Sequence, residues 1–446
     1  MNSIISVNPK FVITTITALT GLVGAGYCMG RDKKTRLGSK TDERSVENSS
    51  LSKSFKSTEF ETAGQADAVI VDTVNALRID HLLKRILNID KNKAGAEEEI
   101  RILKSEVRKL LTTNRGGNKG IHGFIGETSQ VHIANVKAFT EGNEPLYILL
   151  DDNSMTDYCR GMQIIQQKAC QANGYLGLDA IKRHMLKYPE FVKHNGIYQI
   201  PKDMYEKYEW LKNLPDDVAL KLQREDLRCW RYIKNFTKEY PDAIIEPMEV
   251  GYADIQAGNI KSTIHQVENS TEKKFDRQYK DAHEEYAPTF KEFAKVCGIS
   301  AAIEGGIYAG TEFILKLKAG KKLSEFTKQD FKDIRSKLII GCGSGAFRSS
   351  VIYMFTNIYQ IPAALISGMI TALIGITHES YLLIKRKVNK KEFVRNSIFI
   401  STEAAASSGG ATLGKYLCKK HPIIGSIAGS ILGSASVKCF YKITFA

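Results

Sequence analysis

The sequence predicts an α+β protein: a mostly helical chain with a small mixed-sheet domain in the middle and a glycine-rich, hydrophobic helical bundle at the C-terminus. Three observations support this fold class. Apolar residues recur at intervals of three and four over long stretches, which is the spacing of amphipathic helices. Short apolar runs of strand length lie between residues 146 and 169. The last third of the chain combines long apolar segments with glycines at four-residue intervals.

The net charge of +14 lies at the two ends of the chain. Residues 296–446 hold 20 Lys and Arg against 8 Asp and Glu, whereas residues 61–295 hold 34 against 36. Because the basic excess accompanies the most apolar segments, it favours an anionic membrane surface over a general nucleic-acid patch. The eight cysteines form no C-x-x-C pair. This argues against a zinc site or a disulfide scaffold and suits a reducing compartment.

The N-terminal segment, residues 1–30, is predicted to be a transmembrane anchor. Residues 11–30 are uncharged and mostly apolar, and about 20 residues of helix span a hydrocarbon core. A basic cluster, residues 31–36, follows the segment, which places the rest of the chain in the cytoplasm. A cleaved signal peptide and a soluble helix are the alternatives. Residues 31–66 are rich in Ser, Thr, Lys and Glu and are predicted to be a polar linker.

The next segment, residues 67–111, is predicted to be a helical hairpin. Apolar residues recur at three- and four-residue intervals from Val69 to Ile86 and again from Ile100 to Leu111. The residues between these runs, 92–95, include Asn92 and Gly95, and we expect them to form a turn.

Residues 112–290 are predicted to form an α+β domain with a helical extension. A helix over 122–139 carries Glu127, and a strand-like run over 146–150 follows it. Asp157 precedes a second strand-like run over 162–169, in which alternation places Gln166 and Lys168 on one face. Helices then follow over 178–188, 204–240 and 255–283, and we expect 189–201 to be loop. Aromatic residues among the Lys and Arg of 204–240 suit either base stacking or core packing.

The C-terminal region, residues 291–446, is predicted to be membrane-associated. Gly425, Gly429 and Gly433 form a GxxxGxxxG run of the kind that lets helices approach closely, either within the chain or between copies in a homo-oligomer. Glu304, Arg348 and other charges interrupt the apolar segments, however. A compact soluble helical bundle is therefore the alternative to membrane insertion.

Four residues of the middle domain suit metal-dependent cleavage of a phosphodiester. Magnesium prefers oxygen ligands, typically one or two carboxylates with waters and substrate phosphate. Asp157 is the first candidate ligand, Glu127 the second, and the Gln166 carbonyl a neutral third oxygen. Lys168 would orient the attacking water or stabilise charge in the transition state. The alternative is that Asp157 caps a turn and Lys168 is a solvated strand residue.

This arrangement resembles the PD-(D/E)xK, or restriction-endonuclease-like, nuclease superfamily. The resemblance covers residues 117–201 and rests on Glu127, on Asp157 and on the Gln166-x-Lys168 triplet, in which Gln stands in place of the second acid. Met155-Thr156 precedes Asp157 where the family has Pro. The family implies a central mixed sheet flanked by helices, magnesium as the cofactor, and DNA or RNA as the substrate.

These observations together predict a membrane-associated protein with a magnesium-dependent nuclease-like domain, of the kind used in bacterial defence or as a toxin-type effector. The middle domain is expected to be cytoplasmic. The alternative is a non-enzymatic, membrane-associated helical protein whose middle domain is a binding module.

Overall fold

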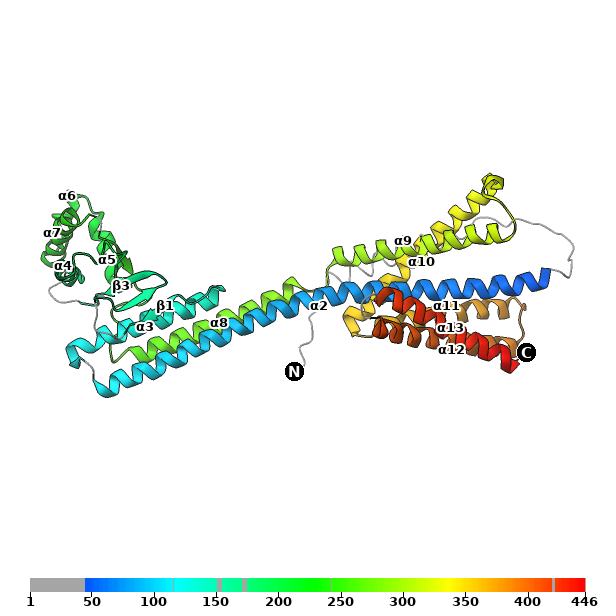
Figure 1. Cartoon of the computed structure of the whole chain (residues 1–446), viewed down its shortest axis with the longest axis horizontal. Coiled ribbons are helices and arrows are strands. Elements are labelled where there is room, and N and C mark those ends of the chain that lie inside the picture. The colour runs from blue at the N-terminus through cyan, green and yellow to red at the C-terminus, as the bar shows by residue number, and fades with distance from the viewer. Residues whose placement is uncertain are drawn as a thin grey trace. The chain divides into compact units, whose positions relative to one another are not determined.

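The computed structural model describes two compact units, which Figure 1 shows in one view. The central unit is Leu82–Glu285, and the bundle unit is Met1–His81 with Tyr286–Ala446. The described residues are 45–114, 116–150, 155–170, 175–241, 243–418 and 422–445. The predicted anchor, residues 1–30, lies outside them. The predicted mostly helical chain with a small mixed sheet in its middle is confirmed.

Helix α2 replaces both the predicted hairpin and part of the predicted linker, because it runs unbroken over Ser45–Thr113. The expected turn at residues 92–95 is therefore wrong. Gly95 lies inside the helix, and a side chain at this position would meet the Phe139 ring at 2.5 Å. The apolar runs on either side of Gly95 belong to one buried cluster, which holds Ile89 and Ile100 together. Tertiary packing thus overrides the local turn signal.

The second half of α2 belongs to the central unit, where it packs with two further helices. These are α3 (Gly117–Glu141) and α8 (Ile260–Glu285), and their apolar faces meet in a shared cluster around Leu103, Ile125 and Phe275. The units accordingly divide at His81 and Glu285, whereas the sequence suggested boundaries at 111 and 290. The central unit begins at Leu82 rather than at residue 112 because apolar residues between Ile89 and Leu110 are buried in its core.

The central unit contains a five-stranded mixed sheet in the order β1-β2-β3-β4-β5. The first three strands are antiparallel and the last two pairings are parallel. The strands are β1 (Tyr147–Leu149), β2 (Tyr158–Arg160), β3 (Gln163–Gln167), β4 (Ile197–Ile200) and β5 (Ile245–Pro247). Strand β4 corrects the expectation of a loop over 189–201. All four of its residues are buried, so neighbouring strands and helices define it rather than alternation.

Helices cover both faces of this sheet. On one face Val131 of α3 packs on Tyr158, Ile165 and Ile197. On the other face a larger apolar cluster contains residues of three helices, including Ile181, Leu211 and Trp230. Those helices are α4 (Leu178–Lys187), α5 (Lys202–Lys212) and α7 (Arg224–Glu239), and the short α6 (Asp216–Ala219) lies between the last two. The aromatic residues expected either to stack on bases or to fill a core thus lie largely in the core.

The bundle unit is entirely helical among its described residues. Its helices after α2 are α9 (Phe290–Lys318), α10 (Lys328–Tyr359), α11 (Ala363–Ile384), α12 (Lys390–Leu417) and α13 (Pro422–Phe445), with the 3-10 turn η2 (Leu323–Glu325) between α9 and α10. Glycines set the closest approaches between neighbours. A Cβ on Gly429 would lie 2.0 Å from the Gly410 carbonyl oxygen. The predicted glycine run therefore packs α13 on α12 within one chain.

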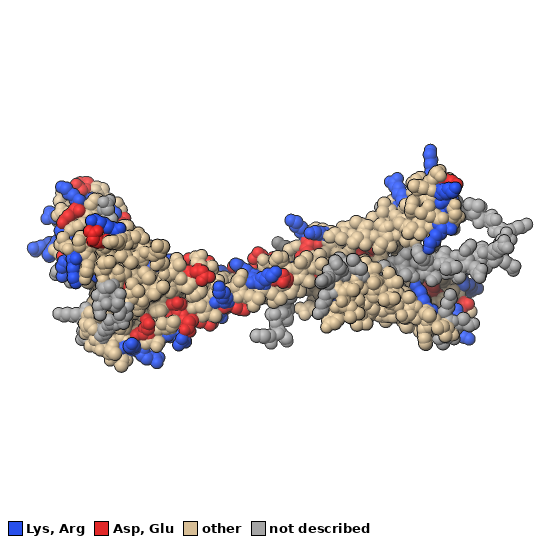
Figure 2. All heavy atoms as spheres, viewed as in Figure 1, with Lys and Arg blue, Asp and Glu red and all other residues tan. Residues whose placement is uncertain are grey.

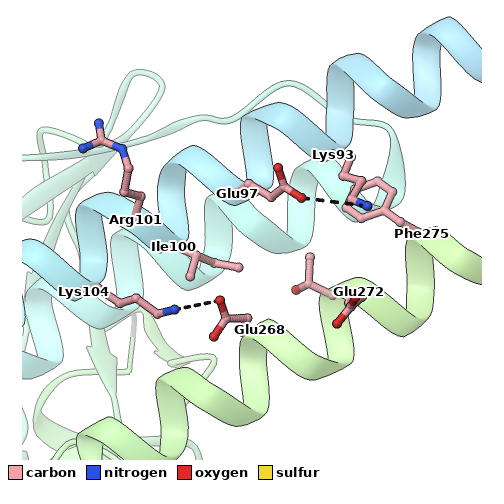
Figure 3. A pocket seen from close by; sticks show the side chains of 9 residues that line it. Lys93, Glu97, Ile100, Arg101, Lys104, Glu268, Glu272 and Phe275 are labelled. Atoms are coloured by element: carbon pink, nitrogen blue, oxygen red, sulfur yellow. Dashed lines mark hydrogen bonds and ion pairs between the residues drawn. The ribbon is translucent and has the colours of Figure 1, made fainter.

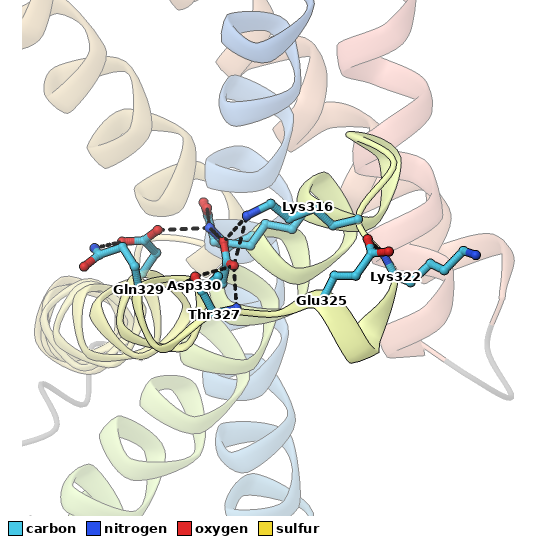
Figure 4. Close-up of polar contacts among 9 residues, drawn as sticks. Lys316, Lys322, Glu325, Thr327, Gln329 and Asp330 are labelled. Carbon is cyan, nitrogen blue, oxygen red and sulfur yellow. Dashed lines mark hydrogen bonds and ion pairs between the residues drawn. The ribbon is translucent and has the colours of Figure 1, made fainter.

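Ion pairs hold the turn between α9 and α10, as Figure 4 shows. Asp330 accepts hydrogen bonds from Lys316 Nζ at 2.9 Å and Lys321 Nζ at 2.8 Å. The same carboxylate accepts from the backbone N–H of Thr327 at 2.8 Å, which closes a capping box at the start of α10. The turn is thus fixed by charges at the end of two apolar helices.

The bundle unit places apolar side chains outside and polar side chains inside. Glu304, Arg348 and Glu403 are at most 1% exposed, whereas Leu373 and Leu432 are 66% and 68% exposed. Over α9 and α10 the visible surface in Figure 2 is largely uncharged until their turn, where Lys and Arg gather. Two described helices, α10 and α11, are long and apolar enough to cross a membrane, judged by length and composition alone.

Candidate functional site

Asp157 and Gln166 are in contact at the junction of β2 and β3. Asp157 lies one residue before β2, and its backbone N–H donates to the Ile165 carbonyl at 3.0 Å. Because Tyr158 faces α3, the alternation of the strand turns Asp157 to the opposite face. There its Oδ2 accepts from Gln166 Nε2, and it also accepts the Gln167 backbone N–H at 2.7 Å.

Lys168 follows β3 and lies close enough to feel the charge of Asp157. Its backbone N–H donates to the Gln199 carbonyl at 2.8 Å, which extends the pairing with β4 beyond the strand end. Burial lowers the pKa of Lys168, and the negative charge of Asp157 opposes that shift. A lysine amine with a lowered pKa is closer to its neutral, proton-accepting form at neutral pH.

Burial also dominates the electrostatics of Asp157. It raises the pKa of this carboxyl group, while Lys168, the Gln167 backbone and the Gln166 side chain oppose the shift. The neighbouring protein groups therefore offset only part of the free-energy cost of burying the negative charge of Asp157. An added cation would stabilise its charged form.

Glu127 lies on α3, the helix that covers the Tyr158 face of the sheet, and Asp157 and Gln166 lie on the opposite face. The helix comes close to β3 at the preceding residue, because a Cβ on Gly126 would lie 2.5 Å from Gln167 Nε2. Burial lowers the pKa of Lys168 and raises that of Tyr158; the charge of Glu127 opposes the first shift and adds to the second. The structure thus brings Asp157 and Gln166 into direct contact, with Lys168 within electrostatic range of Asp157, whereas Glu127 acts on Lys168 and Tyr158.

His184 belongs beside this cluster, although its spacing in the sequence suggested no role. It lies on the buried face of α4, and its Nδ1 is 2.9 Å from the Tyr198 hydroxyl. Burial, and after it the positive charge of Lys168, lower the pKa of His184 to about 4. His184 is therefore neutral at pH 7. One local feature indicates this position: His184 follows the buried Ile181 by three residues, so both lie on the same face of α4.

Gln167, the last residue of β3, is a second residue at this site that the sequence did not predict. Its side-chain amide donates to the Gly123 carbonyl at 3.3 Å, so it faces α3 rather than Gln166. Its side-chain oxygen is buried and accepts no hydrogen bond from the described residues. A neutral oxygen in this state is either a cost to folding or a point where a ligand or water can bind.

The donor set matches magnesium in type but is sparse. Within the described ranges no three His, Cys, Asp or Glu side chains gather as a metal-binding group. An ion that keeps several waters needs one or two carboxylates. Asp157 supplies one of them, and Glu127 is the predicted second. The uncompensated burial of Asp157 is the observation that makes these residues fit a cation. Asp151 and Asp152, the adjacent acids that precede Asp157 in the sequence, lie outside the described residues.

A groove between α2 and α8 is a separate feature of the central unit, shown in Figure 3. One ion pair crosses it, with Lys104 Nζ 2.7 Å from Glu268 Oε1, whereas Lys93 and Glu97 pair along α2. Ile100 and Phe275 form its apolar floor and belong to the buried cluster between the helices. The groove contains none of the four candidate residues, so we interpret it as a surface feature of helix packing.

Comparison with known proteins adds nothing to this geometry, since no family model, curated protein or solved structure matches the chain. The resemblance to restriction-endonuclease-like nucleases therefore stays a prediction.

Proposed function

We propose that the protein is a membrane-associated, metal-dependent phosphodiester hydrolase whose reaction centre is Asp157, Glu127, Gln166 and Lys168. The observation that carries the proposal is the Asp157 cluster. A half-buried carboxylate whose pKa is raised by burial there contacts a glutamine amide and lies within electrostatic range of a lysine whose pKa burial lowers. Perturbed titratable groups of opposite charge in one cluster are characteristic of catalytic sites.

Each residue then has a distinct task. Asp157 and Glu127 would hold magnesium, which when bound supplies charge neutralisation at the phosphate and a more acidic attacking water. Gln166 orients the Asp157 carboxylate through its hydrogen bond. Lys168 orients the attacking water and, when protonated, stabilises negative charge on the phosphate oxygens. His184 stays neutral beside Lys168 and so adds no repulsion.

The first prediction concerns cleavage by the full-length protein in detergent micelles. Wild type with Mg²⁺ or Mn²⁺ should cut single- or double-stranded DNA or RNA. Asp157→Ala and Lys168→Ala should each lower the rate by at least about a hundredfold, because each removes a group acting in the transition state. Lys193→Ala, an exposed lysine paired with Glu190, is the matched control and should leave the rate unchanged.

The competing function is a binding module without catalysis. The Asp157 Oδ2 atom is already satisfied by two donors of its own strand pair, which is what a purely structural acid requires. Failure of wild type to cleave any of these substrates, or equal cleavage by Lys168→Ala, would reject the hydrolase in favour of this alternative.

Membrane association rests on the surface of the bundle unit. Apolar side chains project from α11 at Leu365, Met369 and Leu373, one helical turn apart. Buried polar groups and small residues between helices, with apolar side chains outside, are the pattern of helices packed in lipid. A soluble protein would expose so continuous an apolar stripe only at an interface.

The second prediction is that the full-length protein resists alkaline carbonate washing of membranes. Lipid-exposed apolar helices are not released when peripheral electrostatic contacts are broken. Leu373→Arg should weaken retention, because a charge at the centre of a span costs about 2.5–3.5 kcal/mol. Complete release of the wild-type chain by carbonate would exclude integral insertion and favour the soluble bundle.

A further inference from the structure

Helix α7 carries a basic stripe along its exposed face. Arg224, Arg228, Arg231 and Lys238 follow one another at intervals of four, three and seven residues, which keeps them on one side of a helix. All four are exposed. The opposite side of α7, which includes Trp230, is buried in the core of the central unit.

The acidic residues of α7 do not neutralise this stripe. Asp226 pairs with Lys207 of α5 at 2.6 Å, and Glu239 pairs with Lys182 of α4 at 2.6 Å. Among the described residues, none of the four basic side chains of the stripe forms an ion pair with a carboxylate. Their charge therefore faces solvent, in a unit that holds 31 Lys and Arg against 31 Asp and Glu in all.

Packing connects the stripe to the segment that leaves the candidate site. Gly177 lies against the end of β3, because a Cβ there would be 3.0 Å from the Lys168 carbonyl oxygen. Two residues earlier, the ring of Tyr175 stacks on Tyr232 of α7, with centroids 4.5 Å apart. The Arg228 guanidinium lies over that same ring at 5.0 Å. Helix α7 is thus a neighbour of the chain that follows Lys168.

We propose that this stripe binds the phosphate backbone of a nucleic-acid substrate. The inference rests on the proposed hydrolase and names its substrate class. From Arg224 to Lys238 the helix extends about 21 Å, the length of roughly six base pairs of a duplex. A row of unpaired guanidinium and ammonium groups matches the regular negative charge of such a backbone. The contacts read phosphate and carry no base sequence.

The test separates binding from cleavage by adding EDTA. Fluorescence anisotropy would follow the full-length protein in detergent with a labelled DNA duplex of about 20 base pairs, and with the corresponding single strand. The triple variant Arg224→Gln, Arg231→Gln, Lys238→Gln should bind duplex on the order of a hundredfold more weakly at about 0.1 M salt. The slope of log K against log salt should shrink by about 2.7.

A matched triple variant on another exposed helix provides the control. Lys261→Gln, Lys273→Gln, Arg277→Gln on α8 removes the same charge from the same unit and should bind like wild type. An equal loss in both triples, unchanged binding of the α7 triple, or no binding by wild type to either nucleic acid would overturn the assignment. Binding that depends on α7 without any cleavage in Mg²⁺ would support the stripe while rejecting the hydrolase. Cleavage that depends on Lys168 but not on α7 would do the reverse.

Discussion

Replacing Arg348 by Met is expected to destabilise the bundle unit by about 3–5 kcal/mol, because it leaves buried carboxylates without their cation. Arg348 of α10 is 1% exposed and Glu304 of α9 is fully buried, with Nη1 and Oε1 3.1 Å apart. Asp67 of α2 is also fully buried, and it interacts electrostatically with both residues. Arg348 therefore pairs with Glu304 and attracts Asp67, while the two acids disfavour each other's charge.

The stability of the bundle unit would be measured by titrating the detergent-solubilised protein with SDS. Circular dichroism would follow the loss of helix. Both tryptophans, Trp210 and Trp230, lie in the central unit, so their fluorescence should not change with the variant.

Two further variants make the explanation specific to the ion cluster. Glu304→Gln should cost less than Arg348→Met, because Asp67 remains as a partner for Arg348. The double variant Arg348→Met, Glu304→Leu should regain part of the lost stability, since it removes the guanidinium together with the carboxylate that it pairs with and leaves Asp67 as the one acid of this cluster. Equal losses for the two single variants, with no recovery in the double, would contradict a charge-compensation role.

Replacing Gly410 by Ala should force α12 and α13 apart and cost about 1–3 kcal/mol. A Cβ at this position would lie 2.1 Å from the Gly429 carbonyl oxygen, and that atom is backbone, so no side-chain rotation can relieve the clash. The backbones of α12 and α13 thus meet along a row of glycines, the seam. It continues at Gly414, where a Cβ would lie 1.9 Å from the Gly425 carbonyl oxygen. The helices meet along glycines because nothing larger fits between their backbones.

The neighbouring glycine is a control with the opposite expected sign. A Cβ on Gly409 meets nothing within 4 Å, and Gly409 lies in the interior of the same helix. Gly409→Ala should therefore leave the seam intact and stabilise α12 by about 0.5–1 kcal/mol through its higher helix propensity. The SDS titration by circular dichroism would measure both variants. A loss of similar size in Gly409→Ala would show that the backbone contact at Gly410 is not what makes alanine costly in this part of α12.

Several features could be predicted from local sequence alone. The helices of the bundle unit follow from long apolar segments separated by basic or polar turns, and the close seam follows from glycines four residues apart. In the central unit, alternation along 162–169 placed Gln166 and Lys168 on one face. The hydrogen bond from Gln166 to Asp157 lies on that face. These features depend on residues within one or two turns of each other, where periodicity is informative.

Other features arose only from contacts between distant segments. Strands β4 and β5 are three or four residues long, too short for alternation to show, and their partners across the sheet define them. Position 95 of α2 favours glycine because the Phe139 ring occupies the space where a side chain would lie. His184 comes beside Lys168 because α4 folds back over the sheet, which no local spacing encodes.

Local sequence patterns therefore predict the helical character of the chain, the apolar character of its C-terminal third and the common face of Gln166 and Lys168. Contacts between distant segments set which charges are buried together, which glycines lie in the seam and which residues surround Asp157. The physical reason is that periodicity reports which side of an element is apolar, whereas burial and electrostatic neighbours depend on which other element covers that side.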